Sequence, residues 1–495
     1  MLLDFRPHTR LRATEPVDLT TAVTPVVAAL RGSTLDLGRV RVVCDWVQYR
    51  ENFRDVVVRP VLPSSVRRAG GRAPVPTPAA VRDDDVEVAV DVRRSAHVAL
   101  EEVTARRLRG DGGDRVYLEP WGPGTASCVW GFNALYWSAL SQWEKATGRG
   151  YEQALPGGES DARNRDAARE LIADLFATWD ALVTARALPD ELYVVELGVG
   201  NGNQAKVFLD EFRRMDAAAG AGYYRRLHYL MCDYSPHVLA LAAETVADHA
   251  DRVSAVALDA TRPLTALGFL KYKVFLVYVS NVYDNLPTDE VAQLGGRAYR
   301  VETRAYLPPE GAGELAASLG VAPEQLAGHV HKLLRLGPEL LAEAVPERFP
   351  TVDAAVGFWR RAWSLLRLAE RYAPVTGLDE YALAPGLTGE ILRPLLESGA
   401  DLRMHVNNGA LASFTESLLL LHPHGRLVCH DLFVTELAGY RTTFRGPGKY
   451  DGSVVNWVNG PLVAHVGRRR GFDVHYEPFR HRAGNIVTMT AQVRE

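Results

Sequence analysis

The fold of this chain is decided by the stretch Tyr193-Val194-Val195-Glu196-Leu197-Gly198-Val199-Gly200-Asn201-Gly202. Its first half is a short apolar run that predicts a buried strand, and residues 204–215 have the apolar spacing of a helix. Glycines in a turn between a strand and a helix let the backbone pass close to a ligand without a Cβ clash. The free N–H groups at the start of the helix can then bind a polar or anionic part of that ligand. The stretch therefore predicts a ligand-binding turn.

Strands and helices alternate around this turn. Further strands are predicted over residues 227–232, 253–258, 274–279 and 426–429, and further helices over residues 237–247, 410–421 and 461–469. This alternation predicts an α/β fold with a Rossmann-like, doubly wound parallel sheet. Residues 472–478 and 486–493 predict two final strands that pair as an antiparallel hairpin. Such a hairpin is the usual end of a class I methyltransferase sheet and is not typical of a plain dehydrogenase sheet.

The predicted sheet occupies residues 161–300 and 405–495. Residues 301–404 are expected to form an inserted helical subdomain that lies over the site as a lid, with its best helices at 333–344 and 354–372. Residues 1–160 are expected to form an N-terminal α+β extension, and whether it folds independently stays open.

Two stretches of the extension have unusual composition. Residues 64–80 are rich in glycine, proline and small side chains, which predicts a linker or loop. Residues 119–151 contain many aromatic side chains, including Trp121, Trp130 and Trp143. Packing against the main domain is the plainer interpretation of these rings, and substrate binding is the alternative.

Composition and charge narrow the function classes. The chain has 495 residues with 56 Lys and Arg and 60 Asp and Glu, and the net charge of −4 gives no reason to expect nucleic acid as a partner. No apolar run approaches the ~20 residues of a membrane-spanning helix, so no membrane partner is expected. The four cysteines are scattered and the N-terminus lacks the apolar core of a secretory signal, which fits a cytoplasmic setting. A homodimer is one expectation for the oligomeric state.

Four residues of the turn carry the cofactor assignment: Glu196, Gly198, Gly200 and Gly202. Their pattern is E-x-G-x-G-x-G, and Asn203 stands where a dinucleotide fingerprint has its third glycine. The missing glycine and the acidic residue at the strand end favour S-adenosyl-L-methionine over NAD. The start of the following helix is expected to hold the amino-acid part of this cofactor.

Residues at the ends of the next strands extend the predicted cofactor site. Asp233 follows the second strand, where a carboxylate can accept both ribose hydroxyls, although Asp233 or Ser235 can instead cap the next helix. Asp259 and Ala260 follow the third strand, where the acid can accept a hydrogen bond from the adenine amino group or simply face solvent. Ser280 follows the fourth strand and is assigned to the cofactor site as well.

Polar residues after the fourth and fifth strands are the candidates for the methyl-acceptor side. Asn281, Tyr283 and Asp284 lie where such folds place ligand-facing residues. A carboxylate there can orient or deprotonate a nucleophile and a ring can shield a sulfonium, whereas the plainer alternative is a polar turn. His430 can act as a base or be structural. No metal is predicted, because the histidines do not fall at a known metal spacing: His405, His422, His424 and His430.

These motifs, in this order, resemble the MidA-type methyltransferases. The resemblance covers residues 166–286 and 410 to the C-terminus, and it rests on residues 168–172, 195–202, 230–236 and 281–287 and on the final helix and hairpin. Its more specific elements are Ser235-Pro236 and Asp284-Asn285-Leu286-Pro287. Since the family includes mitochondrial complex I assembly factors that methylate arginine in a protein, the resemblance implies a class I S-adenosylmethionine-dependent methyltransferase that acts on a protein side chain.

The chain departs from that family on the acceptor side. Asn281-Val282 stands where the family has Asn-Glu, and His430-Asp431-Leu432-Phe433 stands where the family has Asp-Tyr-Gly. A methyltransferase for a small metabolite and a non-catalytic binding or assembly module therefore stay open as alternatives. A tight pocket lined by the insertion and the aromatic segment would favour a metabolite as the substrate. A wide acidic groove would favour a protein substrate, and a blocked channel beside residues 281–284 would favour the non-catalytic module.

Overall fold

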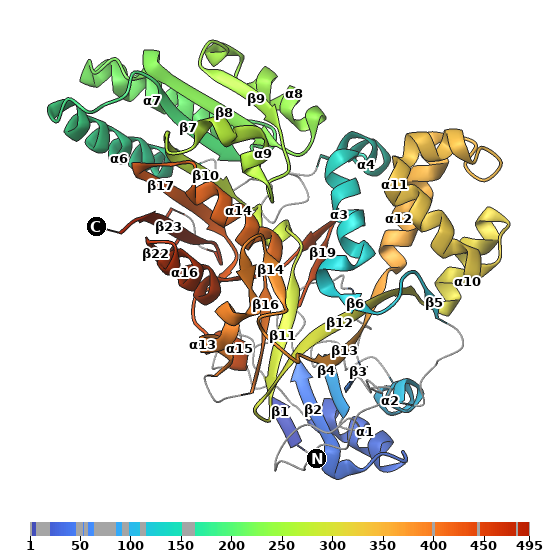
Figure 1. Ribbon diagram of the computed structural model, residues 1–495. Coiled ribbons are helices and arrows are strands. Elements are labelled where there is room, and N and C mark those ends of the chain that lie inside the picture. Colours follow the sequence, from blue (N-terminus) through green and yellow to red (C-terminus); the bar gives the residue numbers. More distant parts are fainter. Residues whose placement is uncertain are drawn as a thin grey trace.

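The computed structural model describes residues 2–5, 20–45, 53, 58–63, 86–91, 99–108, 115–150, 164–397, 401–442, 446–481 and 484–494 of the chain. The predicted linker at residues 64–80 lies outside the described residues. Two large β-sheets organise the described part, with helices packed on their faces (Figure 1).

The first sheet has seven strands in the order β22-β23-β17-β10-β7-β8-β9. Its strands are β7 (Leu192–Leu197), β8 (Leu227–Asp233), β9 (Val253–Ala257), β10 (Val274–Ser280), β17 (Leu421–Asp431), β22 (Phe472–Pro478) and β23 (Val487–Val493). Strands β17 to β9 pair parallel, whereas β23 pairs antiparallel with both β17 and β22. The strand order reverses between β7 and β10. In such sheets the ligand crevice lies outside the carboxyl ends of the strands at this reversal.

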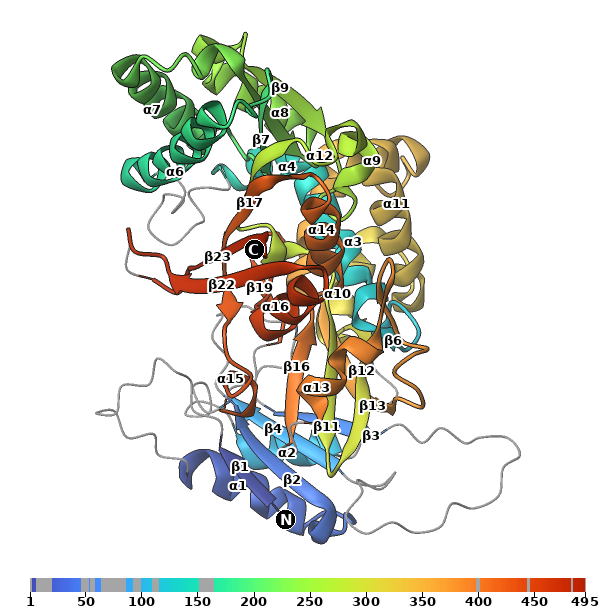
Figure 2. The ribbon, with the colours of Figure 1, turned by 60° about the vertical axis from the view of Figure 1, so that its left-hand side comes forward.

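Helices cover both faces of this sheet (Figure 2). One face packs on α6 (Arg165–Thr184), α7 (Asn203–Ala219) and α8 (Pro236–Thr245). The other face packs on α9 (Pro263–Leu267), α14 (Asn408–Leu418) and α16 (Gly460–Arg469). Because β10 lies between two helical layers, its residues from Val274 to Val279 are all buried, as expected for a central parallel strand.

The second sheet has ten strands, which the sequence patterns did not predict as one unit. Its main order is β1-β2-β4-β3-β13-β12-β11-β16, and β5 and β6 pair with β12. The strands are β1 (Leu2–Phe5), β2 (Val40–Asp45), β3 (Val58–Pro63), β4 (Val86–Asp91), β5 (Val116–Tyr117), β6 (Gly122–Pro123), β11 (Asp289–Leu294), β12 (Arg297–Leu307), β13 (Arg367–Pro374) and β16 (Leu402–Val406). This sheet therefore combines the N-terminal extension with segments on both sides of residue 301.

The helix predicted over residues 354–372 is wrong in its second half. Helix α12 (Val352–Leu365) ends at Leu365, and β13 follows directly. Alternate residues of β13 are buried, and the strand pairs antiparallel with β12 from Arg367 to Pro374. Pairing with a strand some 70 residues earlier overrides the local helical pattern. The inserted region thus mixes strands with helices.

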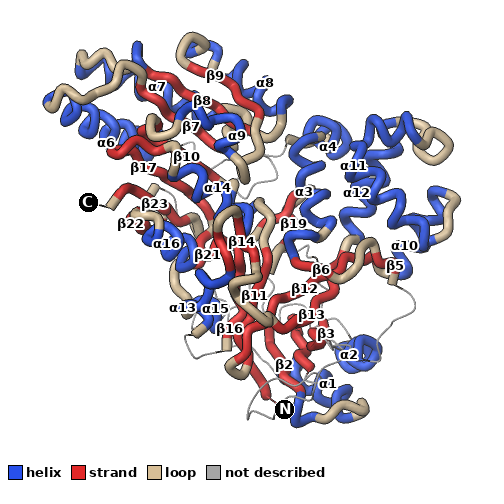
Figure 3. The backbone as a smooth tube through the Cα atoms, viewed as in Figure 1, coloured by secondary structure: helices blue, strands red, loops and turns tan. Residues whose placement is uncertain are grey.

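The helical part of the insertion packs on the aromatic segment (Figure 3). Helices α10 (Pro309–Leu319), α11 (Leu326–Ala344) and α12 share a core with α3 (Cys128–Ser138) and α4 (Leu140–Thr147). Trp143 and Trp359 meet at 4.8 Å between ring centroids, and Phe132 lies 5.7 Å from Trp363. These rings are thus packed in the interior, but against the inserted helices and not, as the plainer interpretation expected, against the main domain.

Most of the remaining helices and strands are short, and the two longer ones, α1 and α2, pack on the N-terminal strands. These remaining elements are α1 (Thr20–Arg31), α2 (Leu100–Leu108), β14 (Ala382–Ala384), β15 (Leu387–Thr388), α13 (Arg393–Leu396), β18 (Phe433–Val434), α15 (Gly439–Thr442), β19 (Gly448–Tyr450), β20 (Ser453–Val455) and β21 (Val458–Asn459). None of the described helices has the length and apolar character needed to cross a membrane.

A buried ionic cluster ties three strands of the second sheet together. Arg403 of β16 is 3% exposed, and its Nε lies 2.6 Å from Glu290 Oε2 of β11. Its Nη2 lies 3.2 Å from Glu370 Oε1 of β13. A buried cation with two carboxylate partners is stable only as a complete set, because each charge has lost its hydration.

Replacing Arg403 with methionine is expected to lower the free energy of unfolding by about 3–5 kcal/mol, because two carboxylates stay buried without their cation. Urea denaturation followed by tryptophan fluorescence measures this loss. The control is Arg361→Met, which breaks an exposed pair with Glu314 and should cost less than about 1 kcal/mol. Equal losses in the two variants would contradict the role given to the buried cluster.

Candidate functional site

The predicted glycine turn joins β7 to α7, and its backbone requires glycine. Gly198, Gly200 and Gly202 have φ values of 75°, 58° and 80°, a region that other residues rarely adopt. A Cβ at Gly198 would lie 2.3 Å from Val282 Cγ2, and one at Gly202 would lie 2.8 Å from the Ala242 Cα. The glycines therefore also let the segment after β10 and helix α8 approach the turn closely.

The start of α7 is suited to an anionic or zwitterionic ligand. This helix has 17 residues, and its N-cap residue Gly202 has no side chain to cap it. Asn201 Oδ1 accepts a hydrogen bond from the first N–H group, that of Asn203, at 3.2 Å. Gln204 in its first turn is 7% exposed, and its Oε1 has no hydrogen-bond partner. Helical N–H groups beside an unpartnered amide oxygen fit the carboxylate and the ammonium of an amino-acid moiety. Sequence reasoning missed Gln204, because its burial depends on packing.

Asp233 stands at the carboxyl end of β8 and connects the turn with α8. Its Oδ2 accepts a hydrogen bond from Gly200 N at 3.2 Å, and its Oδ1 accepts one from Ser235 N at 3.0 Å. Burial raises the pKa of this carboxyl. The side chain that caps α8 is Ser235, which accepts from Val238 N. A carboxylate offers about four lone-pair sites, and the backbone N–H groups of Gly200, Ser235 and Tyr234 already bond this one, so Asp233 can still accept a ribose hydroxyl.

Glu196 lies beneath the turn and is only 2% exposed. Tyr229 of β8 donates a hydrogen bond to its Oε2 at 2.6 Å. Burial raises the pKa of Glu196 to about 8, so the carboxyl is largely protonated at neutral pH. The hydrogen bond that Glu196 makes is thus with Tyr229 of the neighbouring strand β8.

The residues predicted to hold the adenine lie on the exposed edge of the sheet. Asp259 is exposed, and its Oδ1 accepts hydrogen bonds from the Thr261 N and Oγ1, both at 2.8 Å. Leu258 N donates to the Asp233 carbonyl oxygen at 3.0 Å, which brings the ends of β8 and β9 together. Ala260 follows at this same edge and is half-buried.

The predicted acceptor residues after β10 are mostly packed inside. Asn281 is half-buried and has a φ of 52°. Tyr283 is fully buried in the apolar core, and Asp284 is buried beside it. The Tyr283 and Asp284 N–H groups donate to Asp431 Oδ2 at 2.8 and 3.3 Å. Helix α3 covers this loop from outside, since Asn133 Nδ2 donates to the Asn285 carbonyl oxygen at 2.8 Å.

Asp284 and Asp431 form a buried carboxyl pair that the sequence did not reveal. Burial and the neighbouring Asp431 charge raise the pKa of Asp284. Burial raises the pKa of Asp431 to about 6. Two carboxyls this close and this buried do not both ionise at neutral pH. Asp431 holds the loop after β10 in place through the Tyr283 and Asp284 N–H groups. The Asp284 side chain is buried and does not face solvent.

His430 points away from this loop, toward the α6 side of the sheet. It is 5% exposed, packs on the rings of Tyr278 and Phe479, and its Nδ1 has no hydrogen-bond partner. Burial, together with the charge of His481, lowers the pKa of His430 to about 4. Ser280 is its partner in the register of β10 and β17.

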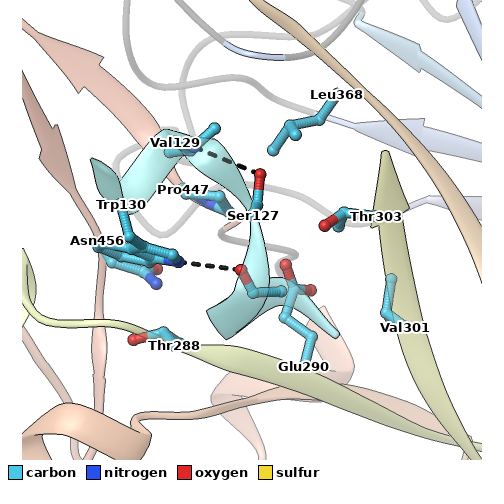
Figure 4. A pocket seen from close by; sticks show the side chains of 11 residues that line it. Ser127, Val129, Trp130, Thr288, Glu290, Val301, Thr303, Leu368, Pro447 and Asn456 are labelled. Carbon is cyan, nitrogen blue, oxygen red and sulfur yellow. Dashed lines mark hydrogen bonds between the residues drawn. The ribbon is translucent and has the colours of Figure 1, made fainter. Parts of the chain in front are cut away.

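Two pockets border these elements. One lies at the start of α3, between the aromatic segment and the second sheet, and is lined by Ser127, Trp130, Thr288, Glu290, Thr303 and Leu368 among others (Figure 4). Several of its polar groups have protein partners: Trp130 Nε1 donates to the Gly124 carbonyl oxygen at 3.0 Å, and Glu290 pairs with Arg403. The other pocket lies between α6 and the terminal hairpin and includes His430. Within the described residues, no group of three or more His, Cys, Asp or Glu side chains could hold a metal ion.

Comparison with known proteins gives no family for this chain. No family model and no curated protein matches it. Among solved structures, a Burkholderia thailandensis protein bound to S-adenosyl-homocysteine is similar with 16% identity over 72% of this chain and 73% of that chain, at a TM-score of 0.41.

Two further solved structures have lower scores. The 1,6-didemethyltoxoflavin-N1-methyltransferase of Burkholderia thailandensis is 10% identical over 77% of this chain and 100% of that chain, at a TM-score of 0.33. The CcbJ methyltransferase of Streptomyces caelestis is 11% identical over 64% of this chain and 90% of that chain, at a TM-score of 0.28. At TM-scores this low, the likenesses carry no argument for the function of this chain.

The buried Glu196 carboxyl predicts a pH-dependent stability. Its pKa of about 8 in the folded chain lies above its ordinary value of 4.5, so the folded state binds more protons than the unfolded state between these pH values. The free energy of unfolding should therefore fall as the pH rises through this window. Glu196→Gln should reduce this fall, measured by urea denaturation at about pH 5 and about pH 8.5.

The matched control is Glu244→Gln on an exposed position of α8. This variant should keep the pH dependence of the unmodified chain. If Glu196→Gln keeps the same dependence as the control, the carboxyl does not titrate in this window.

Proposed function

We propose that this chain is an S-adenosylmethionine-dependent methyltransferase. The observation that carries the proposal is the glycine turn between β7 and α7, in which the Gly200 N–H donates to the Asp233 carboxyl group. The turn lies where the strand order reverses, which is the ligand crevice of a doubly wound sheet. The antiparallel hairpin β22–β23 at the sheet edge supports the same class.

Different residues around the turn would bind different parts of the cofactor. The N-terminus of α7 and Gln204 would hold the amino-acid moiety of the cofactor. Asp233 would bind the ribose, and Asp259 and Ala260 would lie beside the adenine. Glu196, which accepts a hydrogen bond from Tyr229, would support the turn from below, and Ser280 would border the cofactor at the end of β10. The bound cofactor would supply an electrophilic methyl group, and the main task of this chain is to position donor and acceptor.

A small-molecule acceptor is favoured over the protein side chain that the MidA resemblance implies. Helix α3 covers the loop after β10 through Asn133, and this loop buries Tyr283 and Asp284. The side chain of a folded protein has little room to approach there. Methylation of a protein side chain remains the alternative proposal.

Calorimetric titration of the full chain with S-adenosylmethionine tests the cofactor assignment. Micromolar binding is expected for the unmodified chain, and NAD should give none. Gly200→Arg should abolish binding, because the long side chain fills the turn. Asp233→Ala should weaken binding roughly 10- to 100-fold, the value of losing charged hydrogen bonds to the ribose.

Gly313→Arg is the matched control, since this helical glycine has nothing within 4 Å of an added Cβ. It should bind S-adenosylmethionine like the unmodified chain. Absence of binding to the unmodified chain would overturn the proposed function, and preferred binding of NAD would replace it by a dehydrogenase assignment.

A further inference from the structure

The pocket between α6 and the terminal hairpin has the features of a ligand site. It is lined by Val428 and His430 of β17, by Thr488 and Thr490 of β23, by Phe479 after β22, and by Leu171 of α6. We propose that this pocket binds the methyl acceptor, and that the acceptor is a small uncharged molecule with a hydroxyl or N–H group. The proposal rests on the proposed function.

The strand registers place this pocket beside the cofactor turn. Ser280 of β10 is paired with His430 of β17, which is paired with Thr488 of β23. One row below, Tyr278 is paired with Glu196 of β7, the residue two positions before Gly198. Paired residues point to the same face of a sheet, and the side-chain period along a strand is two. His430 and the glycine turn therefore lie in the same row, at the carboxyl edge.

The strand spacing sets how far the pocket lies from the glycine turn. Neighbouring strands lie about 5 Å apart, so β17 and β7, which are separated only by β10, lie roughly 10 Å apart. The Asn281 N–H donates to the His430 carbonyl oxygen at 2.9 Å, which fixes the end of β10 against the end of β17. The pocket thus lies on the α6 side of β17, two strands away from the strand that carries the glycine turn.

An unpartnered buried nitrogen is the strongest sign of a missing ligand. His430 Nδ1 has no hydrogen-bond partner, although the side chain is more than nine-tenths buried and lines the pocket. A buried polar atom without a partner costs free energy, so such atoms usually have a partner in the functional state. Because the imidazole is neutral at neutral pH, Nδ1 can accept a hydrogen bond from a hydroxyl or N–H donor.

The charged groups at the rim of the pocket pair with one another. Arg426 Nη1 donates to Asp174 Oδ2 at 2.8 Å. His481 Nε2 lies 3.0 Å from Glu170 Oε2, and Arg480 pairs with Glu477. Each of these charged rim groups thus already has a partner within the protein.

The inner wall then sets the chemical class. It offers the Phe479 ring, the methyl groups of Val428, two threonine hydroxyls and the free His430 nitrogen. These groups are uncharged and combine apolar with hydrogen-bonding surface, so they select an uncharged, partly aromatic molecule that carries a polar group.

The test uses phenol as the probe and anisole as its matched control, because anisole has the same ring but no O–H to donate. The full chain is labelled with ¹⁵N-histidine, and the ring signals of His430 are assigned by their absence in His430→Phe. Phenol should shift these signals saturably. Its dissociation constant should be about tenfold lower than that of anisole, because one hydrogen bond contributes about this difference in affinity. His430→Phe should bind phenol and anisole equally, whereas His475→Phe at an exposed position of β22 should keep the preference.

Unmoved His430 signals, or equal binding of phenol and anisole to the unmodified chain, would overturn the acceptor pocket. That comparison needs no variant, so it holds even if His430→Phe does not fold, and Thr488→Val then serves as the second pocket variant. S-adenosylmethionine binding to His430→Phe is measured separately. Normal cofactor binding with a failed phenol test leaves the proposed function intact, and failure of cofactor binding in the unmodified chain refutes the function itself.

Discussion

The absence of a Cβ at two positions of the glycine turn is the constraint on which the rest of the site depends. Val282 approaches Gly198 so closely that a Cβ would lie 2.3 Å from its methyl group, and α8 approaches Gly202 in the same way. These contacts position the exit of β10 and helix α8 against the turn at the end of β7. The backbone N–H of Gly200 is then free to meet Asp233, which completes the crevice. One short turn thus positions three strand ends.

The two sheets are not independent layers, because they share one apolar core. Val277 of β10 and Met404 of β16 belong to the same cluster of buried side chains, together with Phe414 of α14. The aromatic segment joins them from outside, since Asn133 of α3 bonds both the loop after β10 and the β20 strand at Val454. The scaffold around the proposed site is therefore built from the N-terminal extension, the insertion and the doubly wound domain at once.

Much of the doubly wound domain could be predicted from the sequence. The predicted strand at 227–232 and helix at 204–215 match β8 and α7 within a few residues, because apolar periodicity and turn glycines act locally. The insertion was harder to predict. Residues 367–372 continue the apolar spacing of α12, yet they form a strand, because pairing with β12 and burial of alternate side chains outweigh the local helical pattern.

The site shows the same division between local and long-range information. The sequence by itself determined the glycine turn, the acid after β8 and the alternation around them, because each depends on residue type and spacing along a short segment. Only the tertiary structure decided that Asp284 is buried against Asp431, that Gln204 keeps an unpartnered oxygen, and that His430 faces α6. The physical reason is that burial and hydrogen-bond partners come from residues distant in sequence. Asp431 lies 147 residues from the Asp284 backbone that it binds, and no spacing rule connects two such positions.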